Sequence, residues 1–158
     1  MADKYLGESI KNLGFGLMRL PMLGEEIDIE QVKRMVDTFM SKGFTYFDTA
    51  YVYIGGKSEV ALKEAVVDRY PRDSFQCATK LPLWDQKSIE ELEAIFQESL
   101  DRAGLEYYDF YLLHAMSAER EKKADELGAW DFMKRLKAEG KAKHIGFSFH
   151  DTADALEH

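Results

Sequence analysis

Residues 43–62 read GFTYFDTAYVYIGGKSEVAL, a stretch that joins a candidate strand to a polar loop and a new helix. The run FTYFDT at 44–49 has the aromatic and β-branched residues that are typical of a buried strand. Asp48 stands at its end, and Tyr53 follows five positions later, just before a pair of glycines. The sequence GGKSE lacks the spacer of a phosphate-binding loop, so we interpret the glycines as a flexible turn that opens the next helix.

The hydrophobic period alternates between 2 and 3.6 along the rest of the chain, which predicts strands alternating with helices. Capping-box residues and glycines mark several helix ends. Strands are expected at 13–20, 44–49, 75–81, 107–114 and 143–149, and helices from Asp28 to Gly43, from Val60 to the residue before Pro71, from Ser88 to Gly104, and through Trp130 to Gly140. This order predicts right-handed βαβ units and a parallel sheet, either an open doubly wound sheet or a (β/α) barrel.

Composition and charge limit the classes of function. The 158 residues, 46% of them hydrophobic, suit a single domain over residues 1–158. A net charge of -8 would repel nucleic acid and anionic membranes, which favours a small-molecule partner. The single cysteine, Cys77, excludes an internal disulfide and a CxxC metal site, so we expect no metal and a cytoplasmic location. No apolar run approaches the ~18 residues of a membrane span, so no membrane partner is expected.

The polar side chains at the predicted strand ends suggest a catalytic group. Asp48, Lys80 and His114 lie at the carboxyl ends of three strands, and Tyr53 lies on the loop after one of them. In both parallel-sheet architectures this rim binds ligands. A lysine ammonium beside a phenol stabilises its phenolate, an aspartate can hold that lysine, and a histidine can orient a substrate oxygen. The combination suits proton donation to a carbonyl during hydride reduction by a nicotinamide.

Each of these residues also has a more ordinary interpretation when it is taken alone. Asp48 could cap a strand end, Tyr53 could be an exposed aromatic residue, Lys80 a surface charge and His114 a structural histidine. Only their joint placement favours catalysis. Trp84 suits a substrate pocket and ordinary packing equally well. A sugar-phosphate lyase or isomerase with a Schiff base on Lys80 is a further alternative.

The stretch at 43–62, followed by ATKL at 78–81 and DFYLLH at 109–114, resembles the aldo-keto reductases. The resemblance implies a (β/α)8 TIM barrel, a cofactor that is NADPH or NADH, and a small-molecule aldehyde or ketone as substrate. KYLGESIKNLGFG at 4–16 resembles the family's hairpin, which closes the bottom of the barrel. The implied catalytic tetrad is Asp48, Tyr53, Lys80 and His114, with Tyr53 as general acid, and the implied cofactor contacts are Asp48 and Ser148.

The predicted strand at 143–149 departs from the family pattern. Phe149 stands where many members have an asparagine that binds the nicotinamide carboxamide, so we expect one of these contacts to be missing. Together with the LLHA stretch at 112–115, this variation resembles bacterial members that carry a C-terminal iron-sulfur tail. The single cysteine leaves no residues for such a cluster in this chain.

The length of the chain is a second departure. A complete barrel needs ~250 residues and eight strands, whereas five strands are expected here. We therefore expect the amino-terminal portion of a reductase, truncated after the fifth strand, with an incomplete cofactor site and weak or no activity in isolation. Unpaired sheet edges predict a homodimer or higher homo-oligomer that covers them. The alternative is a catalytically idle half-barrel fragment or engineered assembly module that self-associates.

Overall fold

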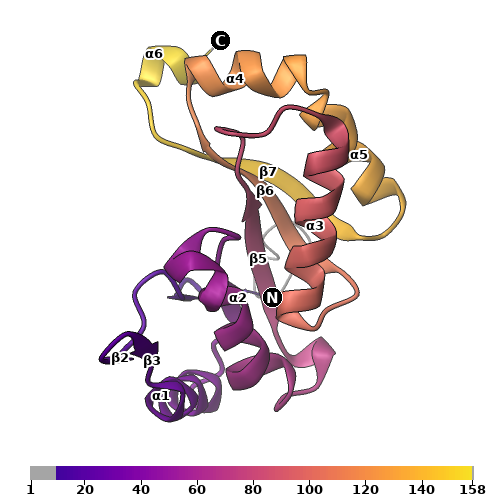
Figure 1. The fold of residues 1–158 in the computed structure, drawn as a ribbon. Helices are drawn as coiled ribbons and strands as arrows, with labels where there is room; N and C mark the ends of the chain where they lie inside the picture. The colour runs from indigo at the N-terminus through magenta and orange to yellow at the C-terminus, as the bar shows by residue number, and fades with distance from the viewer. Residues whose placement is uncertain (1–9, 158) are drawn as a thin grey trace.

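A five-stranded parallel sheet forms the centre of the computed structural model, which describes residues 10–157 (Figure 1). Its strands, in spatial order, are β1 Gly14–Gly16, β4 Tyr46–Asp48, β5 Gln76–Leu81, β6 Tyr108–Met116 and β7 Ala142–Phe149. All neighbouring pairs are parallel. A doubly wound sheet reverses its strand order at a switch point, and these strands do not. Of the two predicted architectures, the sheet therefore has that of a (β/α) barrel, as an open five-stranded part of one.

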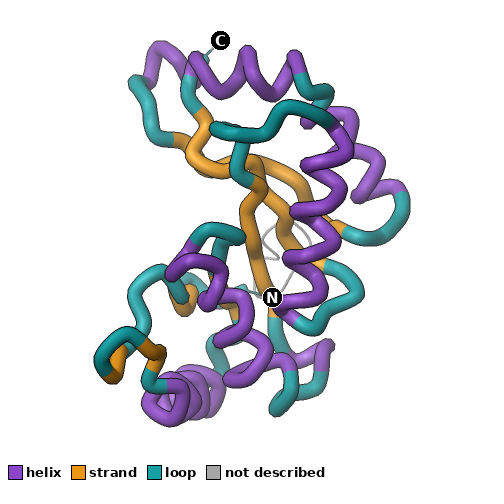
Figure 2. The backbone as a smooth tube through the Cα atoms, viewed as in Figure 1, coloured by secondary structure: helices purple, strands orange, loops and turns teal. Residues whose placement is uncertain are grey.

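Helices connect the strands, as the alternating period predicts (Figure 2). They are α1 Ile29–Ser41, α2 Lys57–Leu62 with a π-helical continuation Lys63–Val67, α3 Ile89–Ala103, α4 Ala118–Glu126 and α5 Ala129–Ala138, and a short α6 Ala153–Leu156 follows the last strand. Two predicted caps are confirmed, because Asp28 accepts a hydrogen bond from the Gln31 amide at 3.0 Å and Ser88 accepts one from the Glu91 amide at 3.4 Å. Within residues 10–157, no helix combines the length and the apolar character that crossing a bilayer requires.

The amino-terminal part differs from the prediction. The strand expected at 13–20 pairs with β4 over three residues only. The Leu17 amide still donates to the Asp48 carbonyl oxygen at 2.8 Å, after which the chain turns into a small antiparallel hairpin, β2 Met22–Leu23 and β3 Glu26–Ile27. Of the hairpin expected at 4–16, residues 4–9 lie outside the described residues.

The segment 118–126 forms a helix that the hydrophobic period did not indicate. Only Ala124 of α4 is buried, so the helix has almost no apolar face and its sequence, AEREKKADE, resembles a solvated loop. The Ser117 hydroxyl caps the helix by accepting a hydrogen bond from the Arg120 amide at 3.3 Å. This short-range bond, rather than burial, determines where α4 begins.

The hydrophobic core fills the space between the sheet and the helices. On α1, Val36 is fully buried and Phe39 is 8% exposed, on the face that the helical period of the sequence marks as apolar. The hydrophobic period of α1 also favours burial of Met35, and this is wrong, because Met35 is 36% exposed; Val60 on α2 is 39% exposed. Met35 lines an apolar groove beside β1, where no described element covers it.

A buried carboxylate joins the amino-terminal ends of three neighbouring strands. Asp109 on β6 is 1% exposed at its side chain and accepts a hydrogen bond from the Cys77 amide of β5 at 3.0 Å. It also forms ion pairs with Arg72 at 2.7 Å and with Lys143 of β7 at 2.8 Å. Paired on both oxygens, this charge fixes β5, β6 and β7 relative to one another at the end of the sheet away from the catalytic candidates.

Candidate active site

The structure brings the four candidate catalytic side chains together at the carboxyl ends of the strands. Asp48 is the last residue of β4, Lys80 lies near the end of β5, and His114 lies near the end of β6. Tyr53 begins the short 3-10 turn Tyr53–Gly56 that follows β4. Because the carboxyl ends of neighbouring parallel strands lie on the same side of the sheet, three strands contribute residues to one cluster.

The Lys80 ammonium lies at the centre of this cluster. Its side chain is 6% exposed, and Nζ donates to Asp48 Oδ1 at 2.6 Å and to the Thr49 carbonyl oxygen at 2.7 Å. The Tyr53 hydroxyl lies 3.4 Å from the same nitrogen, and the Tyr53 ring centroid is 4.9 Å away. A buried ammonium is stable only when it is paired, so Asp48, Tyr53 and Lys80 form one electrostatic unit.

His114 lies beside the phenol of that unit. Its ring centroid is 5.6 Å from that of Tyr53 and 5.3 Å from that of Trp84. Burial lowers the pKa of His114 to about 4, with further contributions from Lys80, His150 and Arg120. Its buried Nδ1 atom has no hydrogen-bond partner among the described residues. At neutral pH the imidazole is therefore uncharged and can donate one hydrogen bond.

The loop that carries Tyr53 turns sharply. Ile54 has a φ of 51°, and the next two residues, both glycine, also have positive φ values. A β-branched residue rarely adopts this conformation, so the surrounding contacts must hold it in place. Arg102 of α3 provides one of them, because its Nη1 donates to the Tyr51 carbonyl oxygen at 3.1 Å. A Cβ atom on Gly56 would lie 2.8 Å from this guanidinium, which explains the glycine.

A buried glutamate supports the loop from behind Arg102. Glu59 of α2 is fully buried and accepts hydrogen bonds from Thr79 at 2.7 Å and from Ser99. Its Oε2 lies 3.6 Å from Arg102 Nη1, while burial raises the pKa of its carboxyl group. Glu59 thus links α2, β5 and α3 around the loop. Neither Glu59 nor Arg102 could be identified from the sequence, because neither stands out from the charged residues of an amphipathic helix.

Ser148, the second predicted cofactor contact, lies next to His114 in space. Its hydroxyl oxygen accepts a hydrogen bond from the Ala115 amide at 2.7 Å, at an irregularity in the pairing of β6 with β7. Within residues 10–157 its hydroxyl proton has no acceptor, so it can donate to a carboxamide oxygen. Phe149 lines an apolar cavity with Trp130 and Leu156, and it offers no polar group in place of the family's asparagine.

The described residues show no arrangement of three or more histidine, cysteine, aspartate or glutamate side chains that could hold a metal ion.

Comparison with known proteins identifies what the chain is similar to. The model of the aldo/keto reductase family matches residues 12–158. An aldo-keto reductase of Mycobacterium tuberculosis is 34% identical over 142 residues, which are 87% of this chain and 48% of that protein. A Klebsiella pneumoniae aldo-keto reductase crystallised with NADPH has a TM-score of 0.73 at 23% identity, over 96% of this chain and 49% of that one. An aldo/keto reductase of Brucella melitensis has a TM-score of 0.65 at 28% identity, over 91% of this chain and 51% of that one. The chain spans about half the length of the curated relatives it matches.

The low pKa of His114 gives a direct test of its environment. In an NMR titration, the ring of His114, assigned with His114→Asn, should titrate with a midpoint of about 4. The unfolded chain binds this proton near pH 6.5, so stability attributable to His114 should fall as the pH drops from about 6.5 towards 4. His114→Gln should lack this part of the acid destabilisation. A midpoint near 6.5 would contradict the buried site.

Proposed function

The chain belongs to the aldo/keto reductase family, and we propose that it reduces an aldehyde or ketone to an alcohol with a hydride from NADPH or NADH. The observation that carries the proposal is the Lys80 ammonium, which contacts both Asp48 and the Tyr53 hydroxyl beside a neutral imidazole. This arrangement combines a proton donor, a charge that stabilises the donor's conjugate base, and a neutral hydrogen-bond donor.

In the proposed reaction, Tyr53 is the general acid. The carbonyl oxygen lies within reach of the Tyr53 hydroxyl, which transfers its proton to that oxygen as hydride adds to the carbonyl carbon. The electron pair of the C=O π bond forms the new O–H bond, and an alcohol and a tyrosinate result. Lys80 stabilises the tyrosinate through its positive charge, and Asp48 keeps Lys80 in place.

His114 orients the substrate in this proposal. An uncharged imidazole can donate a hydrogen bond to the carbonyl oxygen without competing with Tyr53 as the acid. The edge-on contact with Tyr53 and the contact with Trp84 keep the ring in one orientation. Trp84, which is 41% exposed, then forms an apolar wall beside the carbonyl.

NADPH or NADH supplies the hydride when it is bound. Ser148 on β7 has a hydroxyl proton available for the carboxamide, and Asp48 lies at the carboxyl end of β4, on the same side of the sheet. Affinity for a dinucleotide is a sum of contacts along its whole length, and these two residues reach only the nicotinamide end. We therefore expect the isolated chain to bind the cofactor weakly and to reduce its substrate slowly.

The Schiff-base alternative fits the geometry less well. A nucleophilic lysine has to lose its proton, whereas the Lys80 ammonium donates to Asp48 and to the Thr49 carbonyl oxygen, which favour its charged form. The second alternative, an idle half-barrel that self-associates, keeps the same fold and differs only in lacking turnover.

We also propose that a second copy of the chain covers the sheet edges. Strands β1 and β7 lie at the two edges of the five-stranded sheet. Arg34 and Lys42 line the apolar groove beside β1, and Glu121 lines the apolar cavity beside β7. Opposite charges on the two edges favour contact between the β7 edge of one copy and the β1 edge of another.

Replacing the proposed acid tests the reaction. Tyr53→Phe should lower NADPH-dependent reduction of an aldehyde such as 4-nitrobenzaldehyde by about a hundredfold to ten-thousandfold, because the proton donor is lost. Nucleotide binding, followed by NADPH fluorescence, should be unchanged. Tyr70→Phe is the matched control, since its hydroxyl donates to Asp37 on α1. Wild-type rates in Tyr53→Phe would refute the assignment.

Sedimentation equilibrium tests self-association. The wild-type chain should sediment as a dimer or larger species, and Phe147→Glu should shift it towards the monomer by placing a charge at the β7 edge. Phe147 is 44% exposed there. Leu23→Glu is the control, because Leu23 is 68% exposed on the small hairpin. A monodisperse wild-type monomer would count against the second copy.

A further inference from the structure

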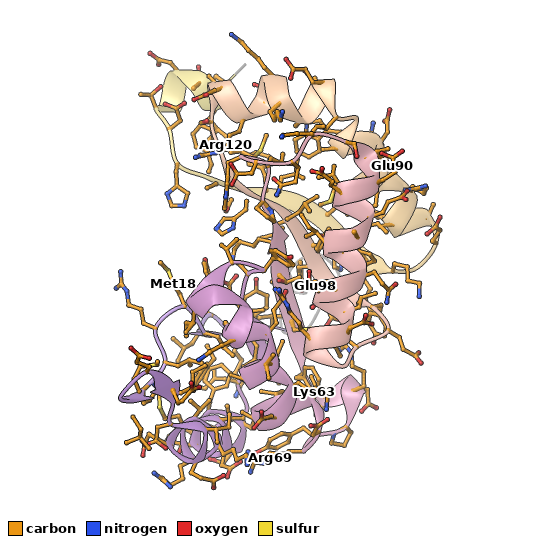
Figure 3. All side chains as sticks on the ribbon, viewed as in Figure 1. Met18, Lys63, Arg69, Glu90, Glu98 and Arg120 are labelled. Atoms are coloured by element: carbon orange, nitrogen blue, oxygen red, sulfur yellow. The ribbon has the colours of Figure 1, made fainter. Side chains whose placement is uncertain are left out.

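A pocket of about 430 Å³ lies between α4 and the loop that follows β5. Figure 3 labels Arg120 below α4, on the side of the helix that faces the strand ends. The pocket has Trp84 in its wall, and its charged lining consists of Glu119, Arg120, Lys122, Lys123 and Glu126. Three cations against two carboxylates leave one net positive charge, in a chain whose net charge is -8.

Arg120 is the fixed cation of this pocket. Its Nη1 donates to the Ala115 carbonyl oxygen at 2.6 Å, and its guanidinium carbon lies 5.5 Å from the Trp84 ring centroid. A guanidinium has five N–H donors, so most of them remain available for a ligand. Among the described residues, no carboxylate lies within ion-pair distance of Arg120.

Four other arginines of the chain are neutralised by a carboxylate, whereas Arg34, on the exposed side of α1, contacts the uncharged Gln31 side chain. Arg69, Arg72, Arg102 and Arg135 each form an ion pair with an aspartate or a glutamate. Arg120 is held instead by a backbone carbonyl and an indole ring, neither of which neutralises its charge. An oriented, uncompensated guanidinium is suited to bind an anion in a bidentate manner.

The pocket adjoins the candidate catalytic cluster through two residues. The Trp84 ring, which contacts Arg120, has its centroid 5.3 Å from that of His114. Ala115, whose carbonyl oxygen Arg120 binds, directly follows His114 in the chain. The positive charge of Arg120 also contributes to the low pKa of His114, which is consistent with this proximity.

From this geometry we propose that Arg120, assisted by Lys122 and Lys123, binds a carboxylate or phosphate group of the substrate while the substrate's carbonyl lies at Tyr53 and His114. The inference rests on the proposed function and names its substrate class, small aldehydes or ketones that carry an anionic group. Trp84 contacts the apolar part between the two groups. Glu119 and Glu126 in the same lining repel anions and therefore limit the anionic charge that the pocket accepts.

Two matched pairs of aldehydes test the subsite by binding, independently of turnover. The first pair is 4-formylbenzoate and its neutral amide, and the second is 4-formylphenyl phosphate and the neutral 4-methoxybenzaldehyde. Binding is followed as quenching of Trp84 fluorescence in a Trp130→Phe background, since the chain has two tryptophans. At least one anion should bind about tenfold or more tightly than its neutral partner, as a charge-assisted bidentate contact predicts.

Arg120→Gln should abolish this preference, and Arg120→Lys should retain part of it, because the charge stays while the bidentate fork is lost. Lys122→Gln provides a second variant within the pocket. Arg135→Gln is the matched control, since Arg135 pairs with Glu93 on the outer surface and should keep the preference. Thermal unfolding of each variant checks that its fold is retained, and if Arg120→Gln does not fold, Arg120→Lys and Lys122→Gln decide the outcome.

The outcomes separate this inference from the proposed function. The proposed anion subsite is overturned if the wild-type chain binds neither anionic aldehyde more tightly than its neutral partner. It is also overturned if Arg120→Gln leaves the preference for the anion unchanged. Loss of NADPH affinity in Arg120→Gln, with the aldehyde preference intact, also overturns it, because the anion bound would be a cofactor phosphate. An Arg120-dependent preference without reduction of either aldehyde supports the subsite and contradicts the proposed reductase activity instead.

Discussion

The buried ammonium of Lys80 is the constraint on which the candidate site depends. A charge at this depth requires partners, and three oxygens from one segment, those of Asp48, Thr49 and Tyr53, surround it. The parallel register that places Asp48 opposite Ala78 brings this segment beside Lys80. Strand pairing and charge pairing therefore require the same arrangement, and a shift of the register would leave a buried charge unpaired.

A second layer holds the phenol in place. The turn after Tyr53 has a conformation that is unfavourable for Ile54, and it persists because Arg102 binds the Tyr51 carbonyl oxygen. Arg102 in turn lies between Glu98 on the surface and the buried Glu59. This chain of contacts runs from α3 through the loop to the candidate cluster, so residues outside the cluster determine where the Tyr53 hydroxyl lies.

The sequence predicted those features that local patterns specify. The capping residues Asp28 and Ser88 begin helices as expected, and the strand-end positions of Lys80 and His114 follow from the parallel-sheet rule. Features that depend on distant residues were missed. The ion pair of Arg102 with Glu59 is one of them, because these residues come from different helices and are 43 positions apart. The exposure of Met35 and the early end of β1 reflect the sheet edge, which no local pattern encodes.

The most direct test of the account is isotope transfer from the cofactor to the product. The chain would be incubated with an aldehyde and NADPH deuterated at the transferred position, at millimolar concentration so that weak binding suffices. The account predicts an alcohol with one deuterium on the former carbonyl carbon, detected by mass spectrometry. An absence of deuterated alcohol, together with a borohydride-trapped substrate adduct on Lys80, would contradict hydride reduction and favour Schiff-base chemistry at that lysine.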